Sequence, residues 1–162
     1  MYKFGHFGAA LLVYAPLGAT VSVVGDGTLA VIGAVVCVSL STVPDCDQYL
    51  PGTEHRGATH TVLFGLLVGT LLAAIATLVG NYSAFTVDRA TAAFVFVVGT
   101  LSIYSHLLAD VITPMGIRPF RPLSDRHYTL SLTRAANPTA NYLLLLVGLG
   151  VTAVITIVVS IG

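Results

Sequence analysis

Histidine and aspartate residues recur in this apolar chain at a spacing that suits metal coordination. His106 and Asp110 are four positions apart, so on a helix both side chains lie on one face. Such a pair offers one imidazole nitrogen and one carboxylate to the same cation. Mixed nitrogen and oxygen ligands suit zinc or another borderline divalent metal without any sulfur. A catalytic site of this kind keeps one coordination position for water, whose pKa the metal lowers.

Other ionisable residues lie close to the ends of apolar runs. These candidates are His6, Asp45, Asp47, His55, Arg56 and His60. Several also have a structural interpretation, because His6 can be a residue at headgroup level, His60 can simply begin a helix at the interface, and aspartates after a proline can be turn or cap residues. Cys46 is interpreted as a small filler residue, with a thiolate ligand as the alternative. The sequence therefore predicts a site only if these residues meet in space.

The composition places the candidates in a membrane protein. Of the 162 residues, 56% are hydrophobic and 9% are charged, whereas soluble domains carry about 25% charged residues. A soluble protein of this size could not cover its surface with so few polar groups. The net charge of zero argues against binding nucleic acid, which needs a basic excess. The length suits a single integral membrane domain spanning residues 1–162.

Charged residues divide the chain into apolar runs. No Asp, Glu, Lys or Arg occurs within residues 4–25, 27–44, 61–87, 90–109 and 135–162. A spanning helix needs about 20 apolar residues, and in lipid its backbone polar groups must be satisfied internally. We therefore predict an all-α polytopic membrane helix bundle with about five transmembrane helices, over residues 5–24, 28–43, 60–80, 90–112 and 141–161. The first is interpreted as a retained helix instead of a cleaved signal peptide. The second is short, and residues 113–140 form an interfacial connection.

The positive residues predict the orientation in the cell membrane. Six of the seven fall in the N-terminal segment, 44–59 and 113–140, and only Arg89 lies on the opposite side. Cytoplasmic loops carry the excess of Lys and Arg, so we expect a cytoplasmic N-terminus. All the candidate ligands then fall at the cytoplasmic face, although most of the charges that set the orientation are other residues.

Several short motifs together resemble a known family. The motifs are Gly5-His6, Pro44-Asp-Cys-Asp47, His55-Arg-Gly-Ala-Thr-His60, His106-Leu-Leu-Ala-Asp110, Thr113-Pro-Met-Gly116 and Pro119-Phe120. Their combination over residues 5–125 resembles the LexA-regulated, inner-membrane-bound, metal-dependent hydrolase family. It is also distantly similar to zinc-dependent phospholipase C and to the single-strand-specific zinc nucleases. Those enzymes bind zinc through a histidine near the N-terminus, an aspartate, a histidine and an H-x(3)-D helix pair.

The resemblance implies a metal-ligand set: His6, Asp45, His60, His106 and Asp110. Asp47 is the alternative to Asp45. The secreted enzymes also use a free N-terminal amine as a ligand, a role that we do not carry over to Met1. No H-x(3)-D or H-x(3)-E pair follows Asp110, so one or two divalent ions, with zinc favoured, fit the ligands better than three.

The leading functional hypothesis is a metal-dependent hydrolase of a phosphoester or lipid-like substrate at the cytoplasmic membrane face. The predicted catalytic residues are His55 or Asp47 as proton carriers, with His55 as an alternative ligand, and Arg56, which would steady a phosphate or an anionic transition state. His127 has no acidic or histidine partner at ligand spacing. An intramembrane protease is disfavoured because the chain has no H-E-x-x-H and no G-x-S-x-G motif.

Two other hypotheses remain. A transporter or metal-handling membrane protein could use the same His and Asp cluster, because such residues also form ion pathways. A structural role would use the metal for stability alone. The sequence leaves the substrate, the identity of the metal and the oligomeric state open.

Overall fold

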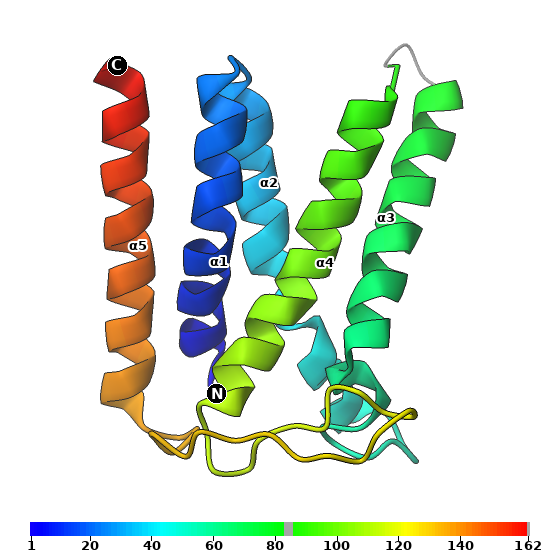
Figure 1. The fold of residues 1–162 in the computed structure, drawn as a ribbon, viewed down its shortest axis with the longest axis vertical. Coiled ribbons are helices and arrows are strands. Elements are labelled where there is room, and N and C mark those ends of the chain that lie inside the picture. Colours follow the sequence, from blue (N-terminus) through cyan, green and yellow to red (C-terminus); the bar gives the residue numbers. More distant parts are fainter. Residues whose placement is uncertain (83–85, 162) are drawn as a thin grey trace.

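The computed structural model describes residues 1–82 and 86–161 as a bundle of helices (Figure 1). The long helices are α1 (Lys3–Val23), α2 (Gly27–Leu40), α3 (Val62–Tyr82), α4 (Arg89–Val111) and α5 (Pro138–Ile161), and two 3-10 helices are η1 (Val43–Tyr49) and η2 (Ala58–His60). Five segments, with α2 and η1 counted together, are long and apolar enough to cross a membrane. The predicted all-α membrane bundle is confirmed.

Two of the predicted helix bounds are wrong by three residues. Helix α5 begins at Pro138 and not at residue 141, because proline is well tolerated at the first helical position and the Asn137 side chain accepts a bond from the Ala140 amide at 3.3 Å. Helix α2 ends at Leu40 and not at residue 43. Pro44 cannot donate to a helical ladder, and the chain tightens there into η1. The other bounds agree with the prediction within two residues.

Helix α2 has only 14 residues, which corresponds to about 21 Å, so it does not by itself cross a hydrocarbon core about 30 Å thick. The chain continues from it into η1, whose seven residues include Asp45 and Asp47. Because α2 ends early, the carboxylates of Asp45 and Asp47 lie level with the terminal turns of the neighbouring helices and not beyond them.

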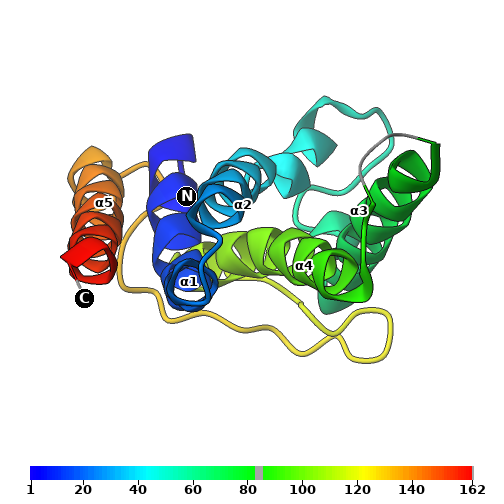
Figure 2. The same cartoon turned by 90° about the horizontal axis from the view of Figure 1, so that it is seen from above.

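Helices α1, α2 and α4 form the centre of the bundle. Each of the three packs on the other two, α5 packs on the outside of α1, and α3 packs on α4, as the view from above shows (Figure 2). The buried core between the central helices includes Tyr14, Cys37 and Val98. In α5 the buried residues are Asn141 and Gly148, so most of its surface is left for lipid.

The two ends of the bundle differ in their polar groups. At one end Asp26 and Asp88 cap α2 and α4, each accepting a bond of 2.8 Å from a backbone amide, that of Leu29 or Thr91. At the other end lie the N-terminus, η1, η2 and the connection between α4 and α5 (Figure 1). All the predicted site residues belong to this second end.

Candidate metal centre

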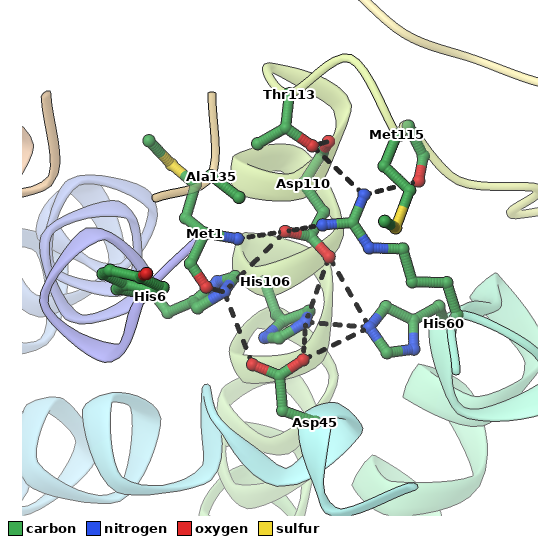
Figure 3. A network of polar contacts seen from close by, with 12 residues as sticks. Met1, His6, Asp45, His60, His106, Asp110, Thr113, Met115 and Ala135 are labelled. Atoms are coloured by element: carbon green, nitrogen blue, oxygen red, sulfur yellow. Dashed lines mark hydrogen bonds and ion pairs between the residues drawn. The ribbon is translucent and has the colours of Figure 1, made fainter. Parts of the chain in front are cut away.

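Four elements bring the candidate ligands together. His6 lies in the first turns of α1, Asp45 in η1, and His60 at the end of η2. His106 and Asp110 lie in the last turns of α4, on one face as their spacing predicts. Figure 3 shows all five side chains converging. The three histidines and Asp110 have an exposed fraction of 0%, so the cluster is closed to bulk solvent apart from Asp45.

Four of these residues offer ligand atoms that lie within 4.8 Å of one another: Asp45, His60, His106 and Asp110. The two histidine Nε2 atoms are 3.1 Å apart. Asp45 Oδ1 is 3.7 Å from Nε2 of His60 and 3.6 Å from Nε2 of His106. Asp110 Oδ2 is 3.6 Å from each Nε2. Ligands about 2.0–2.1 Å from a tetrahedral zinc lie about 3.3–3.4 Å from one another, so the spacing fits a single ion.

Hydrogen bonds hold the imidazoles of His60 and His106 with their Nε2 atoms toward the cluster. His106 donates from Nδ1 to the Ser41 carbonyl oxygen at 2.7 Å. His60 Nδ1 is 3.0 Å from the Thr59 hydroxyl and 3.3 Å from Asp47 Oδ2. Because the carbonyl and the carboxylate only accept, the ring hydrogens belong on Nδ1 and both Nε2 atoms carry lone pairs. Second-shell bonds of this kind orient metal-binding histidines.

The protonation of His60 also suits a ligand. Burial lowers the pKa of His60 below its usual value, because a charged imidazole is poorly solvated in the interior. A neutral ring at neutral pH leaves Nε2 free to coordinate a cation.

The two oxygens of Asp110 have different surroundings. Oδ1 accepts from the Met1 amine and lies 2.9 Å from Arg56 Nη2 in an ion pair. Oδ2 is buried and has no hydrogen-bond partner among the described residues. An unpaired buried carboxylate oxygen is costly, and a cation shared with the two Nε2 atoms would provide its missing partner. The residues present therefore fit a divalent metal.

His6 lies beside the group of four. Its ring stacks on that of His106 with centroids 3.8 Å apart. Its Nε2 donates to the Met1 carbonyl oxygen at 2.9 Å. The same atom is 3.7 Å from Asp45 Oδ2 and 3.8 Å from Asp110 Oδ1. His6 thus faces the outer oxygen of each carboxylate, and its role as a ligand stays a prediction.

Asp47 lies behind His60 and is almost fully buried, with an exposed fraction of 2%. Its carboxylate accepts from His55 Nδ1 at 2.8 Å, the Arg56 amide at 3.1 Å and the Thr59 hydroxyl at 2.8 Å. Asp47, His55 and His60 form a second group at ligand spacing, but Asp47 already accepts hydrogen bonds there. The geometry makes Asp47 an anchor for residues 55–60.

His55 and Arg56 are neighbours in the chain but differ in burial and in their partners. His55 is exposed and uses Nδ1 on Asp47, and its Nε2 has no hydrogen-bond partner among the described residues. Arg56 has a positive φ of 62°, and its side chain turns inward to Asp110. Its Nη1 donates to the Thr113 hydroxyl at 3.1 Å and the Gly116 carbonyl oxygen at 2.8 Å. The Arg56 charge therefore neutralises a candidate ligand.

A pocket of about 410 Å³ adjoins the cluster, and its lining includes Met1, Asp45, Cys46, His55 and Arg56. It is the cavity through which a substrate would reach Asp45, the most exposed candidate ligand. A second pocket of about 420 Å³ lies between α1, α2 and α5, and its described lining carries no Asp, Glu, Lys, Arg or His.

Several contributors to the cluster could not be recognised from the sequence. The Ser41 carbonyl and the Met1 amine are backbone groups, which have no residue signature, and the Thr59 hydroxyl belongs to a residue type common in loops. His127 lies outside the cluster and bonds to the Met115 carbonyl oxygen at 2.8 Å. Cys46 is exposed and does not belong to either ligand group.

Comparison with known proteins gives a family. The family model described as YdjM inner membrane protein matches residues 1–161. No curated protein and no solved structure matches the chain. The chain belongs to the YdjM inner membrane protein family, which agrees with its five membrane-spanning segments.

Proposed function

We propose that this member of the YdjM family is a membrane-embedded, metal-dependent hydrolase of a phosphoester or lipid-like substrate. One observation carries the proposal. The ligand atoms of Asp45, His60, His106 and Asp110 lie within 4.8 Å of one another beside an open pocket. Nothing in the packing of an apolar bundle needs two lone-pair nitrogens and an unpaired carboxylate oxygen at one point, whereas a divalent ion does.

Zinc is the metal that the donor set favours, with two imidazole nitrogens and two carboxylate oxygens. When bound, the ion would supply Lewis acidity toward a phosphoryl oxygen and an activated water. The three fully buried donors would hold it in place. Asp45, whose side chain is 23% exposed, borders the pocket from which a substrate would approach.

His55 is the residue we assign to proton transfer. Asp47 accepts its Nδ1–H at 2.8 Å, which fixes the tautomer and leaves Nε2 as the basic atom at the pocket. A carboxylate behind a histidine also stabilises the ring when it gains a proton. Asp47 then acts through His55 and His60 and does not touch the substrate.

The depth of the site suggests the type of substrate. The pocket lies at the bundle end that holds η1, η2 and the arginine-rich connection (Figure 1). The bias of Lys and Arg toward this end favours the cytoplasmic membrane face. A phosphoester group at the level of the lipid head groups would reach the pocket without crossing the apolar core.

The test uses purified protein reconstituted in phosphatidylcholine vesicles containing phosphatidic acid. We expect phosphate release and bound metal in the wild type, and loss of both in His106→Gln and Asp110→Asn. Asp26→Asn is the matched control, because asparagine also caps helices well and Asp26 lies at the other end. Full turnover in the presence of a strong chelator would contradict the proposal. Transport of metal across the vesicle membrane without any hydrolysis would favour the transporter hypothesis instead.

A further inference from the structure

A second, smaller pocket lies next to the metal centre. It has a volume of about 150 Å³ and shares His55, Arg56 and Met115 with the larger one. Its other described lining residues include Gly116, Arg118 and His127. The two pockets therefore share one wall.

The small pocket is predominantly basic. Its lining includes four basic side chains, those of Arg56, Arg118, His55 and His127. Its one acidic lining residue among those described is Glu54. Glu54 pairs with Arg121 at 3.2 Å, so its charge is offset. A pocket with this balance favours an anion.

Arg118 has no ion pair or side-chain hydrogen bond among the described residues, although it is half-buried. Three of the four other arginines at this end have partners, and the fourth, Arg134, is exposed. Arg56 bonds to Asp110, Arg121 pairs with Glu54 and Asp125, and Arg126 lies over the Tyr128 ring. A guanidinium has five donors in a fork that matches phosphate oxygens, and those of Arg118 are unused.

The backbone places Arg118 beside His127. Ile117 and Tyr128 form an antiparallel bridge, with N–H to O distances of 3.0 and 2.9 Å between their backbone groups. Arg118 follows Ile117 and His127 precedes Tyr128 in the chain, and both side chains line the small pocket. His127 is fixed by its bond to the Met115 carbonyl oxygen. The bridge thus builds one wall of the pocket from two basic side chains.

Arg56 supplies an independent sign of a missing acceptor. Its side chain is only 8% exposed, and its Nε has no partner among the described residues. Because Arg56 lines both pockets, an anion at the shared wall would lie next to this buried donor.

We propose that Arg118, with Arg56 and His127, forms a subsite for a phosphate-type oxyanion, and that the substrate is a diphosphate ester. One phosphate would lie at the metal centre and the other in the small pocket. The assignment to a substrate rests on the proposed hydrolase, whereas the anion site itself does not. The diphosphate could belong to a lipid head group or to a soluble ester, and both present the same oxygens.

The test measures binding of inorganic phosphate to metal-stripped protein in detergent by calorimetry. We expect binding by the wild type and about ten-fold or greater weakening in Arg118→Gln, since a charge-assisted hydrogen bond is lost. Arg118→Lys should restore part of the affinity, because the charge returns without the fork. Arg134→Gln is the matched control, an exposed arginine of the same connection outside both pockets. Equal phosphate affinity in Arg118→Gln and Arg134→Gln would overturn the subsite.

The same variants separate the phosphate subsite from the proposed hydrolase, and a further titration separates a lipid diphosphate from a soluble one. Phosphate binding that depends on Arg118 in a protein without any hydrolase activity would support the subsite and contradict the proposed hydrolase. Hydrolysis of a diphosphate ester with unchanged KM in Arg118→Gln would overturn the subsite alone. Phosphate titration in phosphatidylcholine nanodiscs, with and without a long-chain alkyl diphosphate, identifies the source. If the alkyl diphosphate weakens the apparent affinity for phosphate, a lipid head group occupies the subsite. If the affinity for phosphate is unchanged, the ligand is a soluble ester.

Discussion

His60 and His106 direct their Nε2 atoms at each other across 3.1 Å, from two elements 46 residues apart in the chain. Each ring carries its hydrogen on Nδ1, because Ser41 and the Asp47–Thr59 pair accept there. Two lone pairs at that distance repel unless a proton or a metal ion lies between them. The surrounding carboxylates of Asp45 and Asp110 make a metal ion the natural occupant.

The first prediction follows from this arrangement. Added zinc should stabilise the wild-type protein, because an ion that binds only the folded state adds about 2.7 kcal/mol at a concentration of 100 times its Kd. In His106→Gln the increase in melting temperature should be lost. The measurement is thermal unfolding in detergent with and without zinc, beside metal analysis of the purified protein.

An exposed control separates specific from general binding of zinc. Asp125→Asn removes a carboxylate that is 80% exposed and lies outside the ligand cluster, so this variant should respond to zinc as the wild type does. Equal stabilisation of His106→Gln and Asp125→Asn would show that the cluster is not the site of binding.

The second prediction concerns Asp47 as an anchor. Asp47→Asn keeps the volume but removes the charge that holds His55 and His60 through Nδ1. Loss of such a partner lowers metal affinity by about 10–100-fold. Absorption of bound cobalt, titrated against a chelator, measures this affinity. A variant that folds and binds cobalt as tightly as the wild type would contradict the anchoring role.

Much of the site could be anticipated because its strongest signals are local. The spacing of His106 and Asp110 places both on one helix face, and the apolar runs predict where the helices end. Asp45 and His60 lie on two short 3-10 helices with no periodicity to follow, so the apolar runs predict only that they share a membrane face, and the motif resemblance is what implies them as ligands. The structure brings all four together.

The parts that the sequence did not indicate depend on backbone geometry. Arg56 has a φ of 62°, a conformation that residue type alone does not predict for arginine, and its side chain points inward to Asp110. The Ser41 carbonyl orients His106, and every residue has a carbonyl. The predicted start of α5 at residue 141 is too late because the predicted connection 113–140 includes Pro138, and proline suits a first helical turn.

The third prediction tests the pairing of Arg56 with Asp110. Both side chains are buried, with exposed fractions of 8% and 1%, and their contact is 2.9 Å. Arg56→Met should lower the free energy of unfolding by about 3–5 kcal/mol, because removing one member of a buried pair leaves a charge with fewer partners. Unfolding in a series of denaturing detergent mixtures measures the loss.

Arg121→Met is the control for that prediction. It breaks pairs with Glu54 and Asp125, whose side chains are 69% and 80% exposed, and exposed pairs contribute about 0–1 kcal/mol. If both variants lose the same small amount, the Arg56 pair does not stabilise the fold.

The last prediction concerns the contact between α1 and α5 at Gly8 and Gly148. A methyl group added at Gly148 would lie 2.6 Å from the Gly8 carbonyl oxygen, so the two backbones meet without room for a side chain. Small residues allow such close approach in membranes. Asn141 of α5 accepts from the Tyr2 amide at 3.0 Å, next to the Met1 amine that bonds to Asp110. Displacing α5 should therefore disturb the metal centre as well as the packing.

We expect Gly148→Val to lower both the melting temperature and the zinc affinity. Gly150→Val lies two residues away on the same helix, where an added methyl group meets nothing within 4 Å, and should change neither. The pair of substitutions shares residue type and helix, so a difference between them reports the close contact alone. If Gly148→Val loses stability but keeps wild-type zinc affinity, α5 holds the bundle together without supporting the metal centre.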